Sequence, residues 1–186
     1  AITAAAESIV LLKNEGATLP LQARTKVAVI GNFAKTPRYQ GAGSSLVTPT
    51  RLVSPFEALE ASSLDITGYA AGFRRFGKRT RRRDITDALK RAESADSTIV
   101  FVGLDESMEA EGLDRSHLQL SSPQLALIDE LTKVHHHVIV VVQSGAPVEM
   151  PFINNPSVKA VIQMGLGGQG AGQAIADILT GAVNPS

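Results

Sequence analysis

Five uninterrupted apolar runs constrain what this chain can fold into more than any other feature of its sequence. They are KVAVIG, LDITGYA, STIVFVG, HVIVVVQ and VKAVIQM, at residues 26–31, 64–70, 97–103, 137–143 and 158–164. Apolar residues, many of them β-branched, follow one another in these runs with little alternation. This pattern indicates strands that are covered on both faces, as in a parallel sheet.

Helical patterns lie between these runs. In SPFEAL, Ser54 suits an N-cap, Pro55 suits the first helical position and Glu57 completes a capping box. SPQLALIDELTKV repeats this arrangement with Ser122 and Pro123. Further helices are expected at residues 84–95 and 171–181, and in an amphipathic segment, residues 1–14, that Gly16 ends. Strands alternating with helices predict an α/β fold: an open, mostly parallel, doubly wound sheet flanked by helices in a three-layer α/β/α sandwich.

The length and composition bound the function. The 186 residues suit one domain, 1–186, and because the chain starts without methionine and stops at GAVNPS, we expect a fragment of a larger multidomain protein. Lys and Arg number 18, as do Asp and Glu, so we expect neither nucleic acid nor a membrane as a partner. The absence of cysteine excludes disulfides, a thiolate nucleophile and cysteine-ligated zinc, and it leaves the compartment open.

Three local motifs favour plain structural explanations. The basic stretch RRFGKRTRRR (74–83) has no aromatic platform for bases around it and is interpreted as a solvated loop. GLGGQG (165–170) matches G-x-G-x-x-G, but no second strand with an acidic residue follows, so a glycine turn that permits close packing of a helix on a strand is favoured over nucleotide binding. Adjacent side chains in HHH (135–137) point in different directions, so a polar turn is expected, with no metal and no cofactor.

Two loops contain residues that suit ligand binding or catalysis. GAGSS (41–45) lacks the G-K-[ST] ending of a phosphate loop, and its small residues either let a ligand or another domain approach the backbone or form a flexible connection. EAEGLDR (109–115) crowds three carboxylates and an arginine directly after a predicted strand, where open α/β sheets bind ligands. One of its glutamates could act as a general acid, with Asp114 and Arg115 fixing the loop through ion pairs and hydrogen bonds. The residues alone equally describe a solvated charged turn.

Longer segments, in order along essentially the whole chain, point to one family. They are ESIVLLKNEGATLPL, YQGAGSS with VTPT, VGLDESMEAEGLDR, VVVQSGAPVEMPF and GGQGAGQAIADILTGAVNPS. Together they resemble the C-terminal α/β sandwich domain of glycoside hydrolase family 3, the β-glucosidase-like enzymes. The resemblance implies a retaining, exo-acting β-glycosidase that acts on a β-linked glycoside or oligosaccharide. It also implies two partners within the same protein: a preceding (β/α)₈ barrel that carries the aspartate nucleophile, and a following fibronectin type III-like domain.

The resemblance also implies roles for individual residues. It assigns the acid/base to Glu111 in the pattern E-G-x-D-R, with Glu109 as the competing candidate because the length of this loop varies in the family. It implies that QGAGSS faces the sugar, which makes candidates for binding of Arg38, Gly43, Ser44 and Ser45. The family's nucleophile motif contains tryptophan, and this chain has no tryptophan and no barrel. Because a retaining mechanism needs two carboxylates about 5–5.5 Å apart, we expect the isolated chain to fold but to hydrolyse nothing.

Two other classes of function remain open at this point. A sugar- or nucleotide-binding α/β module without catalysis would bind its ligand as an isolated chain. A purely structural domain would tolerate Glu111→Gln in the complete enzyme with almost no change in rate.

Overall fold

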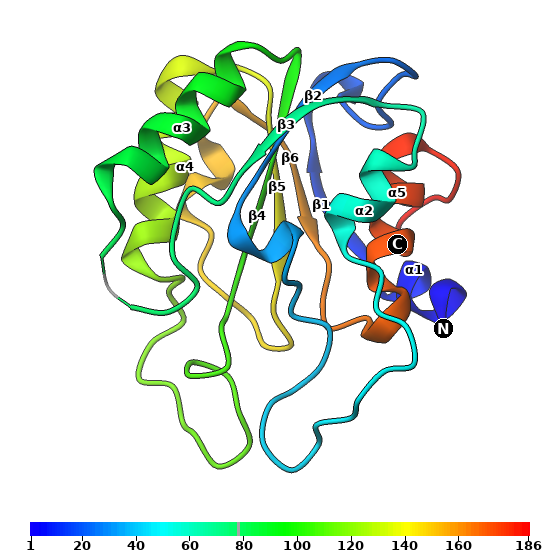
Figure 1. Cartoon of the computed structure of the whole chain (residues 1–186), viewed down its shortest axis with the longest axis vertical. Coiled ribbons are helices and arrows are strands. Elements are labelled where there is room, and N and C mark those ends of the chain that lie inside the picture. The colour runs from blue at the N-terminus through cyan, green and yellow to red at the C-terminus, as the bar shows by residue number, and fades with distance from the viewer. Residues whose placement is uncertain (78) are drawn as a thin grey trace.

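A six-stranded sheet runs through the computed structural model, which describes residues 1–77 and 79–186 (Figure 1). The strand order is β1-β6-β5-β4-β2-β3, with β1 antiparallel to β6 and all other neighbours parallel. The open, mostly parallel α/β sheet predicted from the sequence is confirmed. The strands span Val10–Asn14 (β1), Lys26–Ile30 (β2), Asp65–Ala70 (β3), Ser97–Gly103 (β4), Val138–Gln143 (β5) and Val158–Gln163 (β6).

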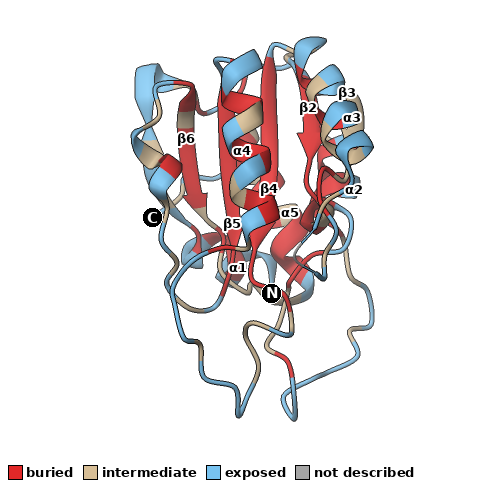
Figure 2. Cartoon of the chain, turned by 90° about the vertical axis from the view of Figure 1, so that its left-hand side faces the viewer, coloured by how far each residue is buried: buried red, intermediate tan, exposed pale blue. Residues whose placement is uncertain are grey.

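The central strands form the core. Every residue of β4 and β5 is buried, and Figure 2 shows these strands enclosed between exposed helix surfaces. Burying one valine or isoleucine side chain completely contributes about 1.5–3 kcal/mol, so the uninterrupted apolar runs stabilise the sheet from both faces. All five predicted runs are strands, with bounds shifted by one residue at most at each end.

The N-terminal segment corrects the helix predicted for residues 1–14. Helix α1 covers only Ile2–Ser8, and the chain then extends into β1 along the edge of β6. Within this segment Ile9 is buried, whereas Ile2 and Leu12 are both 45% exposed. Ile9 and Val10 are β-branched and favour extended backbone, and pairing with β6 prevails over the helical spacing.

The helices form a layer on each face of the sheet, as the sandwich requires (Figure 1). Helices α1 and α2 (Pro55–Glu60) both pack against α5 (Ala171–Thr180), and α3 (Arg82–Glu93) packs against α4 (Ser122–Val134) on the opposite side. The described residues also form four short 3₁₀ turns, at Glu15–Ala17 (η1), Asn32–Ala34 (η2), Pro151–Asn154 (η3) and Gly168–Gly170 (η4).

The two predicted helix starts differ. Helix α2 has the expected capping box, with Glu57 N donating to Ser54 Oγ at 3.2 Å and Ser54 N donating to Glu57 Oε2 at 2.8 Å. Helix α4 does not repeat it, because Ser122 is already helical and no side chain caps the first turn. Instead the buried Gln124 exchanges two hydrogen bonds, of 2.8 and 2.9 Å, with the backbone of Gly103 and joins α4 to the end of β4.

The structure shows the surroundings of two of the three motifs that favoured structural explanations, and of most of the third. In GLGGQG, a Cβ on Gly170 would lie 2.9 Å from the backbone nitrogen of Ile2, so the close approach is to α1 instead of a strand. The basic stretch 74–83 includes Lys78, which lies outside the described residues. His135 Nε2 lies 3.1 Å from the carbonyl oxygen of Ala95, in the turn before β5. Across residues 1–77 and 79–186, no three His, Asp or Glu side chains are grouped to hold a metal ion, and no helix there has the length and apolar character of a membrane span.

Candidate functional site

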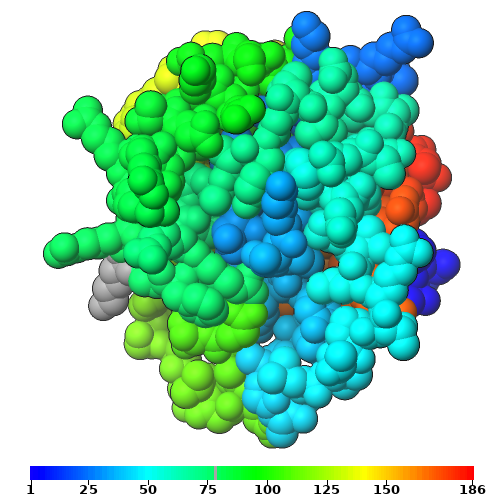
Figure 3. All heavy atoms as spheres, in the orientation of Figure 1, coloured from blue at the N-terminus to red at the C-terminus, as the bar shows by residue number. Residues whose placement is uncertain are grey.

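The carboxyl ends of β2 and β4 are the topological switch point of the sheet. After β2 the chain crosses to β3 on one side of β2 and then returns to β4 on the other side. The loops that follow these two strands therefore leave the sheet next to each other, and this crevice is where open α/β sheets bind ligands. Both loops project from the same end of the molecule, and their surfaces lie side by side there (Figure 1, Figure 3).

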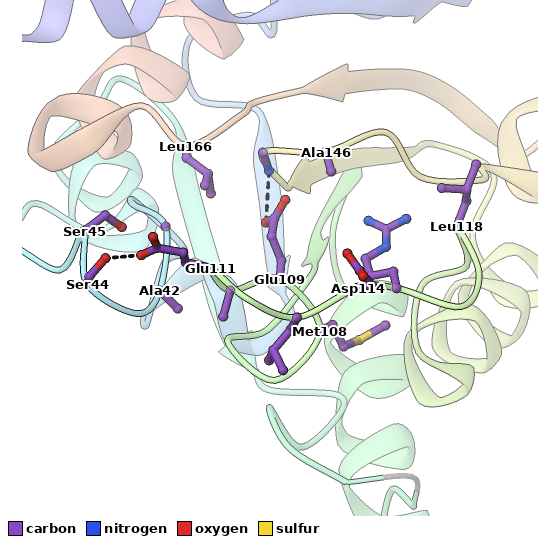
Figure 4. A pocket seen from close by; sticks show the side chains of 15 residues that line it. Ala42, Ser44, Ser45, Met108, Glu109, Glu111, Asp114, Leu118, Ala146 and Leu166 are labelled. Carbon is purple, nitrogen blue, oxygen red and sulfur yellow. Dashed lines mark hydrogen bonds between the residues drawn. The ribbon is translucent and has the colours of Figure 1, made fainter.

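A hollow of about 710 Å³ lies between these two loops. The loops after β5 and β6 complete its wall with Gly145, Ala146 and Leu166. Apolar and ionisable side chains share the lining, so the hollow offers both a surface for packing and groups for chemistry (Figure 4). The labelled side chains are Ala42, Ser44, Ser45, Met108, Glu109, Glu111, Asp114, Leu118, Ala146 and Leu166.

A side chain of the loop after β2, that of Gln40, bridges the two ends of a short segment of the loop. Gln40 Nε2 donates to the carbonyl oxygen of Val47, and Val47 N donates to Gln40 Oε1, both at 3.0 Å. These two bonds tie the ends of the segment GAGSSL together, so it projects as a compact lobe. Ser44 and Ser45 line the hollow from this lobe.

Glu111 lies where the two loops meet. Its backbone N donates to the carbonyl oxygen of Ala42 at 3.3 Å, and its carboxyl Oε2 accepts a hydrogen bond from Ser44 Oγ (Figure 4). Gly43 between these partners has φ +92°, and a Cβ there would lie 3.2 Å from the Cβ of Glu111. Glycine at this position thus allows the close approach of the two loops. The carboxyl group of Glu111 is exposed at the rim of the hollow.

Glu109, two residues earlier, has a different environment. Its side chain is 17% exposed, and its Oε2 accepts from Gly145 N at 3.1 Å and lies 3.4 Å from Arg38 Nη2. The same Nη2 donates to the backbone carbonyl of Glu109 at 2.9 Å. Glu109 is therefore anchored through both its side chain and its backbone.

Arg38 is 1% exposed. Besides Glu109, its guanidinium contacts the carbonyl oxygens of Gln40 at 3.2 Å and Leu104 at 3.4 Å. The family resemblance makes Arg38 a candidate for sugar contact. In the structure its guanidinium is buried against protein groups, and Arg38 is not among the residues that line the hollow.

Asp114 and Arg115 do not form the ion pair that the sequence suggested. Among the described residues, the guanidinium of Arg115 instead donates to two carbonyl oxygens, of His117 at 3.2 Å and of Pro147 at 3.0 Å. The bond to Pro147 holds the loop after β4 against the loop after β5, and the bond to His117 lies within the loop after β4. The exposed carboxylate of Asp114 lines the hollow.

A second arginine–glutamate pair lies beside the site. Arg75 Nε donates to Glu106 Oε2 at 3.1 Å, and Arg75 Nη1 donates to the carbonyl oxygen of Thr36. Burial raises the pKa of Glu106, but the hydrogen bonds and positive charge of Arg75 outweigh it and hold the pKa below its ordinary value. This pair joins the loop 71–77 to both loops of the site.

Sequence reasoning overlooked Gln143 and Gly145. Gln143 is fully buried, accepts from Arg38 N at 2.7 Å and donates to the carbonyl oxygen of Phe33 at 3.2 Å. One signal was present in the sequence, because a buried strand that ends on glutamine places an amide in the interior, where it needs partners. The partners themselves lie more than a hundred positions away and leave no local pattern.

Comparisons with known proteins agree with this architecture. Residues 9–186 match the family model described as the glycosyl hydrolase family 3 C-terminal domain. The chain is 45% identical over 185 residues to thermostable β-glucosidase B of Acetivibrio thermocellus, a match that covers 98% of this chain and 24% of that protein. It is 38% identical over 193 residues to the exo-α-(1→6)-L-arabinopyranosidase of Bifidobacterium longum, with 98% and 25% covered.

Solved structures give the same result. A family 3 β-glucosidase from Bifidobacterium adolescentis superimposes with a TM-score of 0.93 at 38% identity, over 99% of this chain and 27% of that one. A family 3 exo-β-xylosidase superimposes with a TM-score of 0.90 at 36% identity, over 100% and 24%. The chain spans about a quarter of the length of the curated relatives it matches. It belongs to glycosyl hydrolase family 3 and corresponds to the C-terminal domain of that family.

Proposed function

We propose that this chain is the C-terminal domain of a retaining, exo-acting β-glycosidase and that it supplies the general acid/base, Glu111. A (β/α)₈ barrel of the same protein would complete the site and carry the nucleophile. One observation carries the proposal: the carboxyl group of Glu111 is exposed at the rim of a hollow at the switch point, with its backbone held by Ala42. Membership of the family supports the reaction class.

The geometry suits proton transfer to a group outside the chain. In the first step Glu111 protonates the glycosidic oxygen while the nucleophile attacks the anomeric carbon, and in the second it takes a proton from the attacking water. Ser44 engages carboxyl Oε2, so we assign the transferred proton to Oε1. The leaving group would then lie in the hollow, against Leu113 and Leu118.

We assign the acid/base to Glu111 in preference to Glu109. The carboxylate of Glu109 is held by Arg38 and by the backbone N of Gly145 (Figure 4), and its side chain is only 17% exposed. A group that must give and take a proton in each turnover needs access to the leaving group and to water, and Glu111 has that access.

The substrate class is a glycoside with a terminal sugar. Relatives that match this domain are named as a β-glucosidase, an arabinopyranosidase and xylosidases, so the sequence of the domain is compatible with several sugars. We infer that the missing barrel selects the sugar, and that Gly43, Ser44 and Ser45 contact it from this side.

The test uses the full-length parent enzyme with Glu111→Gln and aryl β-glycosides of good and poor leaving groups. A poor leaving group needs protonation, so its kcat/KM should fall by about 10²–10⁴-fold, with a much smaller loss for the good one and recovery with azide. Glu109→Gln is the matched variant. Azide recovery at Glu109 would move the role by two residues, and an equal small loss for every substrate would leave the domain without a catalytic carboxylate.

The isolated chain separates this proposal from a binding module. We expect no turnover of an aryl β-glucoside and no measurable affinity for the free sugar by calorimetry, because half of the site is on another domain. Robust turnover by the isolated chain would contradict the split site, and tight binding of a sugar or nucleotide would favour the non-catalytic module.

A further inference from the structure

The buried arginine beneath the hollow is the feature that the proposed chemistry does not use. Arg38 is 1% exposed, and a charge removed from water in this way is destabilising unless an opposite charge and hydrogen bonds accompany it. Three carbonyl oxygens, of Gln40, Leu104 and Glu109, accept its hydrogen bonds at 3.2, 3.4 and 2.9 Å. The carboxylate of Glu109, at 3.4 Å, supplies the opposite charge.

This pair joins three separate loops. Arg38 follows β2, Glu109 follows β4, and Gly145, whose N donates to Glu109 Oε2, follows β5. The side-chain amide of Gln143, at the end of β5, accepts from Arg38 N and so ties the arginine to the core of the sheet. Glu109 is therefore linked to the end of β5 through Arg38, whose backbone bonds to Gln143 and whose guanidinium bonds to Glu109.

Glu109 and Glu111 are two residues apart, so a fixed Glu109 confines Glu111 to within about 7 Å of chain. The loops meet a second time at Glu111, whose N donates to Ala42. Two short segments, 38–42 and 109–111, are thus joined at both ends, by Arg38 to Glu109 and by Ala42 to Glu111. A shift at the first junction is transmitted to the second.

We propose that Arg38 and Glu109 are positioning residues, and that their ion pair holds the backbone that presents Glu111 to the leaving group. This inference rests on the proposed acid/base role of Glu111. In this proposal neither residue exchanges a proton with the substrate. Their effect on the reaction is through the place of Glu111 alone, which distinguishes them from residues that merely support the fold.

Glu109→Gln is the first variant, in the full-length enzyme. It keeps the shape and an oxygen for Gly145 but removes the charge that Arg38 requires. Because a displacement of about 1 Å in a reacting group lowers rates by about 10²-fold, we expect kcat/KM for a poor leaving group to fall about 10–100-fold, with a smaller loss for a good one. The matched control is Glu93→Gln, an exposed glutamate on α3, with unchanged kinetics.

Arg38→Lys is a second, conservative variant that should still fold. Lysine preserves the charge opposite Glu109, but its ammonium is a single point and does not replace the fork that spans Gln40, Leu104 and Glu109. Circular dichroism should report a folded protein, and the same leaving-group-dependent loss is expected. A folded Arg38→Lys enzyme with unaltered kinetics for poor leaving groups would overturn the positioning role of the arginine.

The double variant Glu109→Gln/Glu111→Gln is decisive. If Glu109 acts through Glu111, the substitution Glu109→Gln has no further effect on kcat/KM once the carboxyl group of Glu111 has been replaced by an amide. A full additional 10–100-fold loss in that background would overturn the positioning role and leave the role of Glu111 intact. A Glu111→Gln enzyme without leaving-group dependence would instead overturn the proposed function, and the positioning role with it.

Discussion

The base and the tips of the two site loops contrast sharply. At the base, Arg38, Glu109 and Gln143 are buried or nearly so and bonded to several protein groups. At the tips, Glu111 and the segment 44–47 are exposed and joined by few contacts. Contacts within this chain determine the conformation of the base, whereas the tips leave exposed surface for contact with a ligand or another domain. We infer that substitutions at the base change the stability of the chain, and that those at the tips change only the chemistry of the complete protein.

The largest expected effect is that of Arg38→Met in this chain. The substitution leaves Glu109 without its counter-charge and three carbonyl oxygens without their donor. The free energy of unfolding should fall by about 3–5 kcal/mol, measured by urea denaturation followed by circular dichroism. Arg83→Met is the control, because Arg83 is 73% exposed and its loss should cost about 1 kcal/mol or less. A comparable small loss for Arg38→Met would erase the contrast between base and tips.

The same contrast explains what the sequence predicted. The sheet followed from apolar runs, a local pattern, because strands covered on both faces admit few polar residues. The short edge strand β1 was missed, because its five residues are too few for hydrophobic periodicity to separate a strand from the end of a helix. The location of the site loops followed from the rule for strand ends in α/β sheets.

The base of the site was beyond prediction for a physical reason. The bonds from Arg38 join residues 66, 71 and 105 positions apart, and nothing in the residues around Arg38 distinguishes a buried arginine from an exposed one. The QGAGSS segment suggested a ligand contact for the whole loop. Only the three-dimensional arrangement separates its buried anchor, Arg38, from its exposed serines.

Gly43→Ala tests the junction between base and tip. At φ +92° an alanine is strained by about 1–2 kcal/mol, and its Cβ would press on that of Glu111 at 3.2 Å. We expect this loss of stability in the chain and, in the full-length enzyme, a loss of rate that is greater for poor leaving groups. The control is Gly16→Ala, where φ is +63° and the added Cβ meets nothing within 4 Å. Equal kinetics for the two variants would mean that the close approach at Gly43 is unimportant.

The Arg75–Glu106 pair gives a smaller, pH-dependent effect. The pKa of Glu106 is held below its ordinary value of 4.5, so the unfolded chain binds the proton more readily than the folded one. The pair therefore makes its full contribution to the free energy of unfolding above pH 4.5. This contribution is lost as the pH falls below 4.5 through the folded-state pKa. Because Glu106 is 39% exposed, water screens the pair and the contribution is about 1 kcal/mol at most.

Urea denaturation between pH 7 and pH 3 measures this contribution. Glu106→Gln should lower the stability slightly at pH 7 and make the decline below pH 4.5 shallower. Glu93→Gln, at the exposed end of α3, controls for the loss of a carboxylate outside the pair. An unchanged slope in Glu106→Gln would assign the acid sensitivity of the chain to other carboxylates.

Ser44→Ala has the smallest expected effect on stability and the sharpest bearing on the contrast. Ser44 is exposed, so the free energy of unfolding should stay within about 0.5 kcal/mol of the parent value. In the full-length enzyme the loss of the hydrogen bond to Glu111 should lower kcat/KM for a poor leaving group by about 2–10-fold, equivalent to about 0.5–1.4 kcal/mol. Ser45→Ala, a neighbour that lines the hollow without bonding to Glu111, should change kcat/KM by the same factor for good and poor leaving groups. If Ser44→Ala instead destabilised the chain as strongly as a substitution at the base, the tip would contribute to the stability of the fold. The inference that the base determines stability and the tips determine chemistry would then be wrong.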